Sequence, residues 1–157
     1  MTRTADAIII GAGVIGTAIA FELSGKGWKT LSIDRNTQAG HGSTSGSCAI
    51  IRTYYSTLDG TDFAWEGYHF WRDWADYLEA RDPNGLATFK ECGALVMKTE
   101  ANEHMARHME NADILGCPYE EWTPEQVRVR LSGTNTELFH PAKSGDDPAF
   151  GQPTGGH

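Results

Sequence analysis

The sequence lacks the features that would place the chain in a membrane or on nucleic acid. No apolar run reaches the roughly 18 residues that a membrane-spanning helix needs. Basic residues are few, since 13 Lys and Arg stand against 21 Asp and Glu, which gives a net charge of -8. Without a dense basic stretch, we expect no membrane span and no binding to nucleic acid or to anionic membranes.

Cysteine is also scarce. Cys48, Cys92 and Cys117 form an odd set without a CxxC spacing, which predicts neither a disulfide framework nor a structural zinc site. The apolar stretch that begins at Ile8 is too short and too rich in glycine for a signal peptide. We therefore expect reduced thiols in a cytoplasmic protein.

The first 34 of the 157 residues carry a strand–helix–strand pattern. Residues 7–10 are continuously apolar, which is typical of a buried parallel strand. Apolar residues recur at helical spacing over 14–26, and residues 29–34 have the pattern of a second strand. Together these segments predict a βαβ unit, which should be right-handed.

The turn between the first strand and the helix is rich in glycine. It has the GxGxxG pattern, spanning Gly11 to Gly16. Gly11 permits a tight turn, Gly13 lets the backbone approach a pyrophosphate, and Gly16 allows helix and strand to pack closely. The N–H groups at Val14 to Gly16 and the helix dipole attract phosphates. The turn therefore predicts a dinucleotide site, for FAD or NAD.

Two features downstream extend this prediction. Asp34 ends the second strand, where a carboxylate accepts hydrogen bonds from ribose hydroxyls and repels the 2′-phosphate of NADP. The polar loop 36–47 contains Gly42 and Gly46, which allow a close backbone approach, and hydroxyl side chains that can bond phosphate or ribityl oxygens.

The motifs Asp34-Arg35, Gly42–Ser47 and Ile50-Ile51-Arg52 resemble the flavin amine oxidoreductases of the D-amino-acid oxidase and sarcosine oxidase superfamily. The resemblance is specific over residues 7–55 and looser to about Trp122. It implies an extended FAD whose pyrophosphate and ribityl groups lie in the loop 36–47, with the next segment beside the isoalloxazine ring. The implied cofactor-binding residues are Gly11, Ala12, Gly13, Val14, Ile15, Gly16, Asp34, Arg35, Gly42, Ser43, Thr44, Ser47, Ala49 and Ile50.

The same resemblance implies a substrate and a reaction. Arg52 stands where the sarcosine oxidase branch has an arginine that binds the substrate carboxylate, and a guanidinium can hold a carboxylate bidentately. Tyr55 is a further candidate for this pocket. The implied activity is oxidation of the C–N bond of an amino-acid-type amine, such as sarcosine, an N-methyl amino acid or a D-amino acid. Hydride passes to flavin N5, and oxygen or another electron acceptor reoxidises the flavin.

The chain departs from the family at two positions. Ala49 stands where monomeric sarcosine oxidases have a basic residue, so oxidase and dehydrogenase both remain open. Gly46 stands where the dimethylglycine-oxidising branch has a flavin-linking histidine, so covalent attachment there is not implied. An NAD-dependent dehydrogenase and a non-catalytic FAD-binding subunit completed by a partner chain are the alternatives. His104 and His108 have a helical spacing, but no metal motif surrounds them, and we expect no metal site.

The remainder of the sequence predicts further elements. We expect an aromatic helix over 63–80 capped by Asp62, a strand over 94–97, a helix over 100–115 capped by Thr99, a short strand over 118–122, and a helix that begins at Thr123-Pro124. Residues 133–157 are a glycine- and proline-rich tail that should be disordered alone.

The predicted fold class is α/β: a Rossmann-type FAD-binding βαβ unit followed by the start of an α+β substrate domain. The expected divisions are residues 1–60, 61–132 and 133–157. A two-stranded parallel sheet cannot bury both of its faces. We therefore expect the N-terminal part of a larger enzyme, which a missing C-terminal portion or a partner chain completes.

Overall fold

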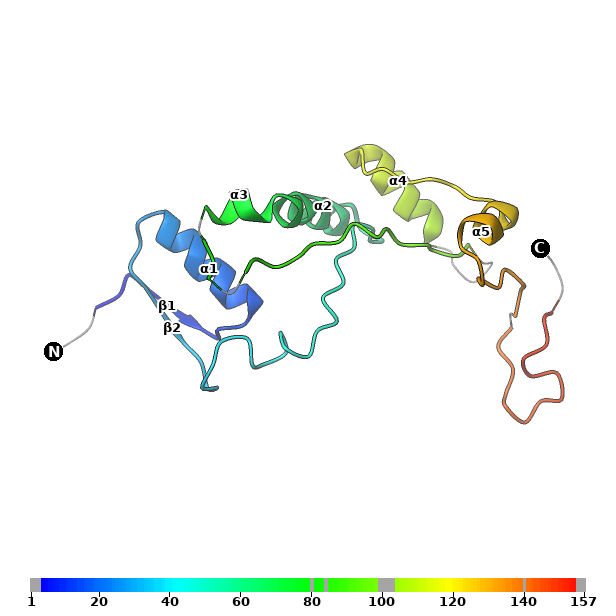
Figure 1. The fold of residues 1–157 in the computed structure, drawn as a ribbon, viewed down its shortest axis with the longest axis horizontal. Coiled ribbons are helices and arrows are strands. Elements are labelled where there is room, and N and C mark those ends of the chain that lie inside the picture. The colour runs from blue at the N-terminus through cyan, green and yellow to red at the C-terminus, as the bar shows by residue number, and fades with distance from the viewer. Residues whose placement is uncertain (1–3, 80, 84, 99–103, 140, 155–157) are drawn as a thin grey trace. The chain divides into compact units, whose positions relative to one another are not determined.

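The computed structural model describes residues 4–79, 81–83, 85–98, 104–139 and 141–154. The chain divides into two compact units, Met1–Arg52 and Thr53–His157. Among these described residues, the first unit contains two strands and one helix, and the second contains helices joined by irregular segments (Figure 1).

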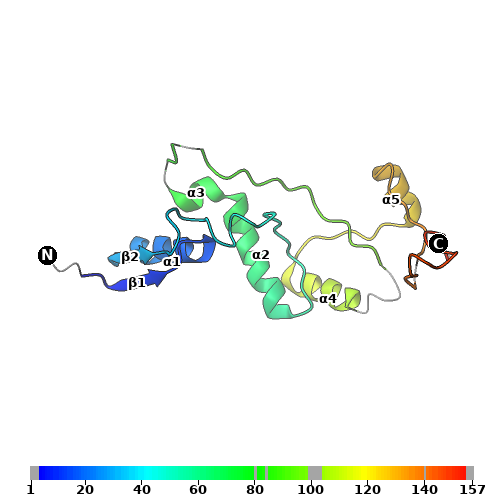
Figure 2. The same cartoon turned by 90° about the horizontal axis from the view of Figure 1, so that it is seen from below.

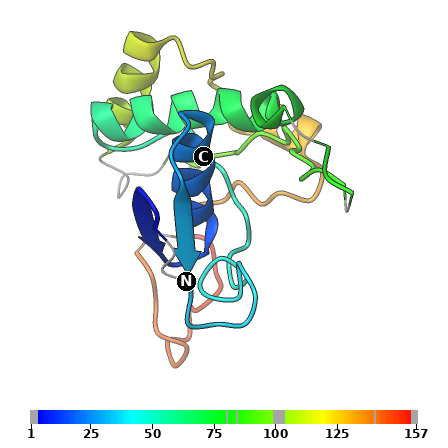
Figure 3. The same ribbon diagram turned by 90° about the vertical axis from the view of Figure 1, so that its left-hand side faces the viewer.

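The first unit is a strand–helix–strand unit. Strand β1 covers Ala7–Ile10, helix α1 covers Val14–Gly25, and strand β2 covers Thr30–Ile33. The strands pair in parallel, with Ile10 opposite Ile33, and α1 packs against both (Figure 3). Gly27 turns the chain from α1 into β2 with a φ of +83°, which glycine adopts without a steric penalty. Both strands and the helix were predicted from the sequence, and the structure confirms them.

The strand pair leaves much of its apolar surface exposed. Ile9 is the one buried apolar side chain among the described residues of this unit, and it is 8% exposed. Ile8 and Ile10, on the opposite face of β1, are 63% and 85% exposed, and Leu31 and Ile33 of β2 are also exposed. Because alternate residues of a strand face opposite sides, α1 covers one face and the other stays open.

The second unit is helical. It contains α2 (Leu58–Arg72), α3 (Trp74–Leu78), α4 (Met105–Leu115) and α5 (Pro124–Arg130), and α2 packs against α4 (Figure 2). No helix within the described residues combines the length and the apolar character that crossing a membrane requires.

Buried polar groups join α2 and α4. The hydroxyl of Thr61 is fully buried, accepts a hydrogen bond from the Tyr55 N–H at 3.2 Å, and lies 3.1 Å from the carbonyl oxygens of Tyr55 and Thr57. Asn111 of α4 donates its amide to the same Tyr55 carbonyl at 3.1 Å. The segment that leads into α2 is therefore fixed to both helices.

The aromatic helix begins earlier than the sequence predicted, and it ends earlier. Its cap is Thr57, whose side chain accepts a hydrogen bond from the Gly60 N–H at 3.2 Å, and Asp62 lies inside the helix. The expected single helix over 63–80 is interrupted at Asp73, whose ψ of 36° ends α2 and precedes the short α3. The Asp62 cap was therefore wrong, because Thr57 provides a cap one turn earlier.

Two predicted strands are absent. Residues 94–97 and 118–122 are irregular, because a strand needs a partner to bond its backbone groups and neither segment pairs with another among the described residues. The start of the helix predicted over 100–115 and its Thr99 cap lie outside the described residues, and α4 is described from Met105. The helix predicted at Thr123 is confirmed as α5. In the tail, residues 133–139 and 141–154 form turns without helix or strand.

Candidate functional site

A cavity of about 570 Å³ lies at the carboxyl ends of β1 and β2. Its walls come from the ends of both strands, the turn between β1 and α1, and the loop after β2. The lining residues are Ile10, Gly11, Gly13, Ile33, Asp34, Arg35, Asn36, Gly42, Ser43 and Thr44. All of them belong to the first unit, and ligand sites of open α/β sheets lie at this end of the strands.

The glycines of the turn are required by close contacts. Gly11 has a φ of +104°, a left-handed conformation that other residues rarely adopt. A Cβ atom on Gly16 would lie only 1.9 Å from the Gly11 carbonyl oxygen, so α1 approaches the turn only because this methyl group is absent. A Cβ atom on Gly13 would lie 2.9 Å from the Thr44 hydroxyl. The backbone of Gly11 and Gly13 therefore lines the cavity directly, with the Thr44 side chain packed against Gly13.

The carboxylate of Asp34 lies beside this turn and binds its backbone. Its Oδ2 accepts a hydrogen bond from the Ala12 N–H at 2.7 Å, and its Oδ1 accepts one from the Asn36 N–H at 2.8 Å. These two backbone donors, the Ala12 N–H first, lower the pKa of Asp34 from its usual 3.8. The group is therefore fully ionised at neutral pH.

The loop after β2 lies over the N-terminus of α1. The Thr44 hydroxyl accepts a hydrogen bond from the Val14 N–H at 3.0 Å, and the Gly40 N–H donates to the Ala12 carbonyl at 2.8 Å. The Ser45 hydroxyl donates to the Gly42 carbonyl at 2.9 Å, which closes the loop on itself. Turn and loop thus form one wall of the cavity.

Other predicted residues lie elsewhere. Ser47 at the end of the loop, and Ala49 and Ile50 after it, do not line the cavity, and Ala49 has an unusual φ of +54°. Arg52 is exposed and is the last residue of the first unit. Tyr55 is half-buried in the second unit, where Thr61 and Asn111 bind its backbone.

Two residues of this site, Asn36 and Gly40, were not predicted from the sequence. Asn36 lines the cavity and its N–H binds Asp34, while the Gly40 N–H binds the turn. The spacing of Asp34 and Asn36 is that of an Asx turn, in which a carboxylate binds the backbone two residues on. That signal could have identified Asn36, whereas nothing local marks Gly40.

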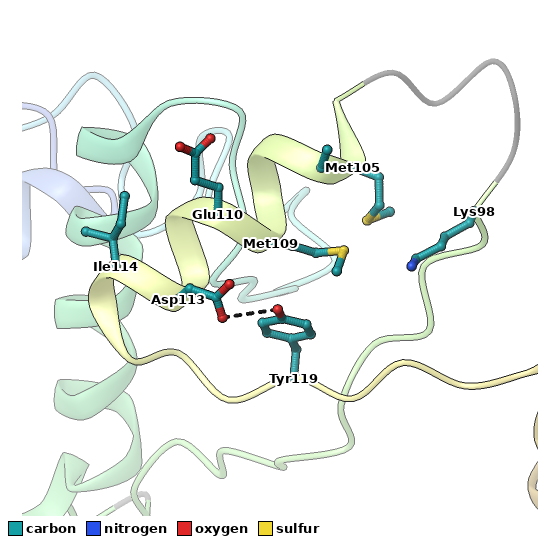
Figure 4. A pocket seen from close by; sticks show the side chains of 8 residues that line it. Lys98, Met105, Met109, Glu110, Asp113, Ile114 and Tyr119 are labelled. Carbon is teal, nitrogen blue, oxygen red and sulfur yellow. Dashed lines mark hydrogen bonds between the residues drawn. The ribbon is translucent and has the colours of Figure 1, made fainter.

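A second, open cavity of about 690 Å³ lies in the second unit. Figure 4 shows its lining, where the Tyr119 hydroxyl donates to Asp113 at 3.1 Å. This hydrogen bond raises the pKa of Tyr119. The lining residues are Lys98, Met105, Ala106, Met109, Glu110, Asp113, Ile114 and Tyr119. No group of three or more His, Cys, Asp or Glu side chains in the described part of the chain could hold a metal ion.

Comparison with known proteins identifies the class. The model of a family described as FAD dependent oxidoreductase (DAO) matches residues 6–150. The chain therefore belongs to this family, its cofactor is FAD, and it is an oxidoreductase. No curated protein and no solved structure matches the chain. The family match decides between the two dinucleotides that the glycine-rich turn left open.

Proposed function

We propose that the first unit is a Rossmann-type FAD-binding unit and that its cavity holds the ADP half of FAD. The observation that carries this proposal is the placement of the glycine-rich turn, Asp34 and residues 42–44 of the following loop around one cavity in a chain of the FAD-dependent family. A cavity of about 570 Å³ is within the usual range for small-molecule sites. The close contact of Gly16 with the Gly11 carbonyl fits the tight packing of helix and turn in a nucleotide-binding unit, and Gly11 and Gly13 line the cavity.

Each wall of the cavity has a distinct role in this proposal. Of the N–H groups at the start of α1, that of Val14 binds the Thr44 hydroxyl, whereas those of Ile15 and Gly16 have no partner within the helix ladder. Together with the helix dipole, these groups attract phosphate oxygens. Asp34 accepts from the ribose hydroxyls, since each carboxylate oxygen keeps a lone pair beyond its backbone contact. Arg35, Ser43, Thr44 and Ser47 supply donors along the pyrophosphate and ribityl groups, and Ala49 and Ile50 lie near the ring.

We propose that the substrate is an amino-acid-type amine, such as sarcosine, another N-methyl amino acid or a D-amino acid. Arg52 binds the substrate carboxylate and so orients the carbon that is oxidised, and Tyr55 is a further candidate for substrate binding. FAD supplies the two-electron acceptor for oxidation of the C–N bond, and oxygen or another acceptor reoxidises it. Support comes from the resemblance of the segment Ile50-Ile51-Arg52 to the sarcosine oxidase branch.

We also propose that further polypeptide, either a C-terminal portion or a partner chain, completes the FAD unit. The exposed apolar side chains of Ile8, Ile10 and Ile33 support this, because a parallel sheet is ordinarily covered on both faces. We accordingly expect this chain alone to bind FAD weakly and to show little activity.

The experiment that tests the substrate proposal changes Arg52 in the FAD-loaded enzyme. We expect Arg52→Ala to raise KM for sarcosine or a D-amino acid by about ten- to hundred-fold, the effect of losing a charge-assisted bond of about 1.5–3 kcal/mol. Arg52→Lys should recover part of this loss, since it keeps the charge without the bidentate geometry.

An amine that lacks a carboxylate is the matched control. Its KM should be the same in wild type and in Arg52→Ala. Equal KM values of the two enzymes for the amino-acid substrate would contradict the role of Arg52.

A further inference from the structure

The carboxylate of Asp34 is bonded on both oxygens by the backbone of its own unit. One oxygen binds the Ala12 N–H in the glycine-rich turn at 2.7 Å, and the other binds the Asn36 N–H at 2.8 Å. The preceding residue of β2 also binds the turn: the Ile33 carbonyl accepts a hydrogen bond from the Gly11 N–H at 2.8 Å. Two consecutive N–H groups of the turn are thus bonded to two consecutive residues at the end of β2.

The contact at Ala12 fixes a peptide plane. The Ala12 N–H and the Gly11 carbonyl belong to one planar trans peptide, so they point in opposite directions. When Asp34 holds the N–H, the carbonyl is directed away from Asp34. That carbonyl oxygen lies 1.9 Å from the place where a Cβ atom on Gly16 would stand, so it packs directly against α1. The orientation of this peptide is therefore set by Asp34 on one side and by α1 on the other.

We propose that Asp34 is a positioning residue for the phosphate-binding turn, in addition to its role as a ribose acceptor. By fixing the peptide between Gly11 and Ala12, it holds the backbone that follows, at Gly13, which lines the cavity, and at Val14, whose N–H binds the Thr44 hydroxyl in the cavity wall. This inference rests on the proposed function, since it assumes that the cavity takes the phosphates of a nucleotide. It adds that Asp34 contributes to phosphate binding without touching a phosphate.

Removal of the Asp34 carboxylate should change pyrophosphate binding in opposite directions for a purely electrostatic role and for a positioning role. Pyrophosphate is an anion, so removal of a nearby carboxylate should strengthen its binding if charge alone matters. If Asp34 positions the turn, its removal should weaken pyrophosphate binding in spite of the lost repulsion. A role confined to ribose predicts a loss for adenosine and none for pyrophosphate.

The experiment titrates the full chain with inorganic pyrophosphate and separately with adenosine. We expect Asp34→Ala to weaken binding of both by about ten-fold, the effect of a lost bond to a charged group. Asp34→Asn should lie between, because an amide has one acceptor oxygen and turns a donor toward the second backbone N–H.

The matched control is Asp6→Ala. The Asp6 carboxylate accepts from the Lys29 N–H at 2.8 Å, so it makes the same kind of contact at the other end of the strand pair. We expect this variant to bind both ligands as wild type does. Loss of adenosine binding with pyrophosphate binding unchanged or stronger in Asp34→Ala overturns the proposal.

Hydrogen exchange of the Ala12 amide is a readout that needs no ligand. It should be about ten-fold faster in Asp34→Ala, intermediate in Asp34→Asn and unchanged in Asp6→Ala, with unaltered exchange within α1 showing that the unit is folded. Unchanged exchange at Ala12 in Asp34→Ala overturns the positioning role. If wild type binds neither ligand, the proposed nucleotide site fails, while the exchange result still decides whether Asp34 orders the turn.

Discussion

At the scale of single residues, Gly16 shows how one absent methyl group determines the site. The Gly11 carbonyl occupies the space that a side chain at position 16 would need, at 1.9 Å from the ideal Cβ position. The contact is with backbone, which cannot rotate away as a flexible side chain can. We expect Gly16→Ala to lower the free energy of unfolding by about 3 kcal/mol and to weaken ADP binding.

Gly25 supplies the control for this variant. It lies at the end of the same helix, and nothing lies within 4 Å of its ideal Cβ position. Gly25→Ala should leave the stability unchanged or raise it by up to about 1 kcal/mol, because alanine favours helix. Urea unfolding measures both variants, and equal stability of Gly16→Ala and wild type would contradict the close packing of the turn.

The pH dependence of Asp34 is a second expectation at this scale. Its pKa in the folded chain lies below the ordinary 3.8, so its contribution to stability is complete above that value and is lost as the pH falls through the lower folded value. The contacts to Ala12 and Asn36 should therefore stay constant from about pH 7 to about pH 5 and fail only below about pH 4. An NMR titration of the Asp34 carboxyl carbon should give a midpoint below 3.8, whereas a midpoint above it would contradict the two backbone contacts.

At the scale of elements, the predictable segments are those whose partners are close in the sequence. The strand–helix–strand unit was predicted from the continuous apolar run of β1, the helical spacing of apolar residues in α1 and the glycines around this helix, and the structure contains it. Residues 94–97 have a similar composition but no partner strand among the described residues, so composition alone was insufficient. The start of α2 was predicted too late, because Gly60 is a poor helix former in sequence. In the structure, Thr57 caps this first turn and the Thr61 hydroxyl bonds the Thr57 carbonyl.

The site was predictable to the same degree. The spacing of the glycines and of Asp34 placed them at one end of two parallel strands, and the structure brings Gly11, Gly13 and Asp34 together with residues 42–44 in one cavity. The hydrogen bond between Gly40 and Ala12 depends on the path of the loop, which no local pattern specifies. The binding roles of these residues stay predictions.

Helix α5 was predicted from its N-terminal capping residues, and its stability can be tested at the cap. Thr123 accepts from the Gln126 N–H at 3.2 Å, and the Gln126 side chain accepts from the Thr123 N–H at 2.8 Å, which is a capping box. We expect Thr123→Ala to cost about 1 kcal/mol and to speed hydrogen exchange at the Gln126 amide, while Thr123→Ser keeps the cap. Identical exchange in the alanine and serine variants would show that the cap does not stabilise α5.

At the scale of the whole molecule, the chain carries a net charge of -8, yet its proposed ligand is an anion. Binding must therefore come from local donors at the start of α1 rather than from the overall charge. The cavity at the ends of β1 and β2 is bordered by the turn that leads into α1, whereas the cavity beside α4 lies in the other unit and is lined by Glu110 and Asp113.

The most direct measurement is an NMR titration of the full chain with ADP, following the backbone amides of both units. Binding at the proposed site shifts the amides of residues 11–16 and 34–44, leaves those of Met109 and Tyr119 unchanged, and weakens in Gly16→Ala. Shifts confined to the cavity of Met109 and Tyr119, or no shifts at millimolar ADP, would contradict the assignment of the glycine-rich turn as the nucleotide site.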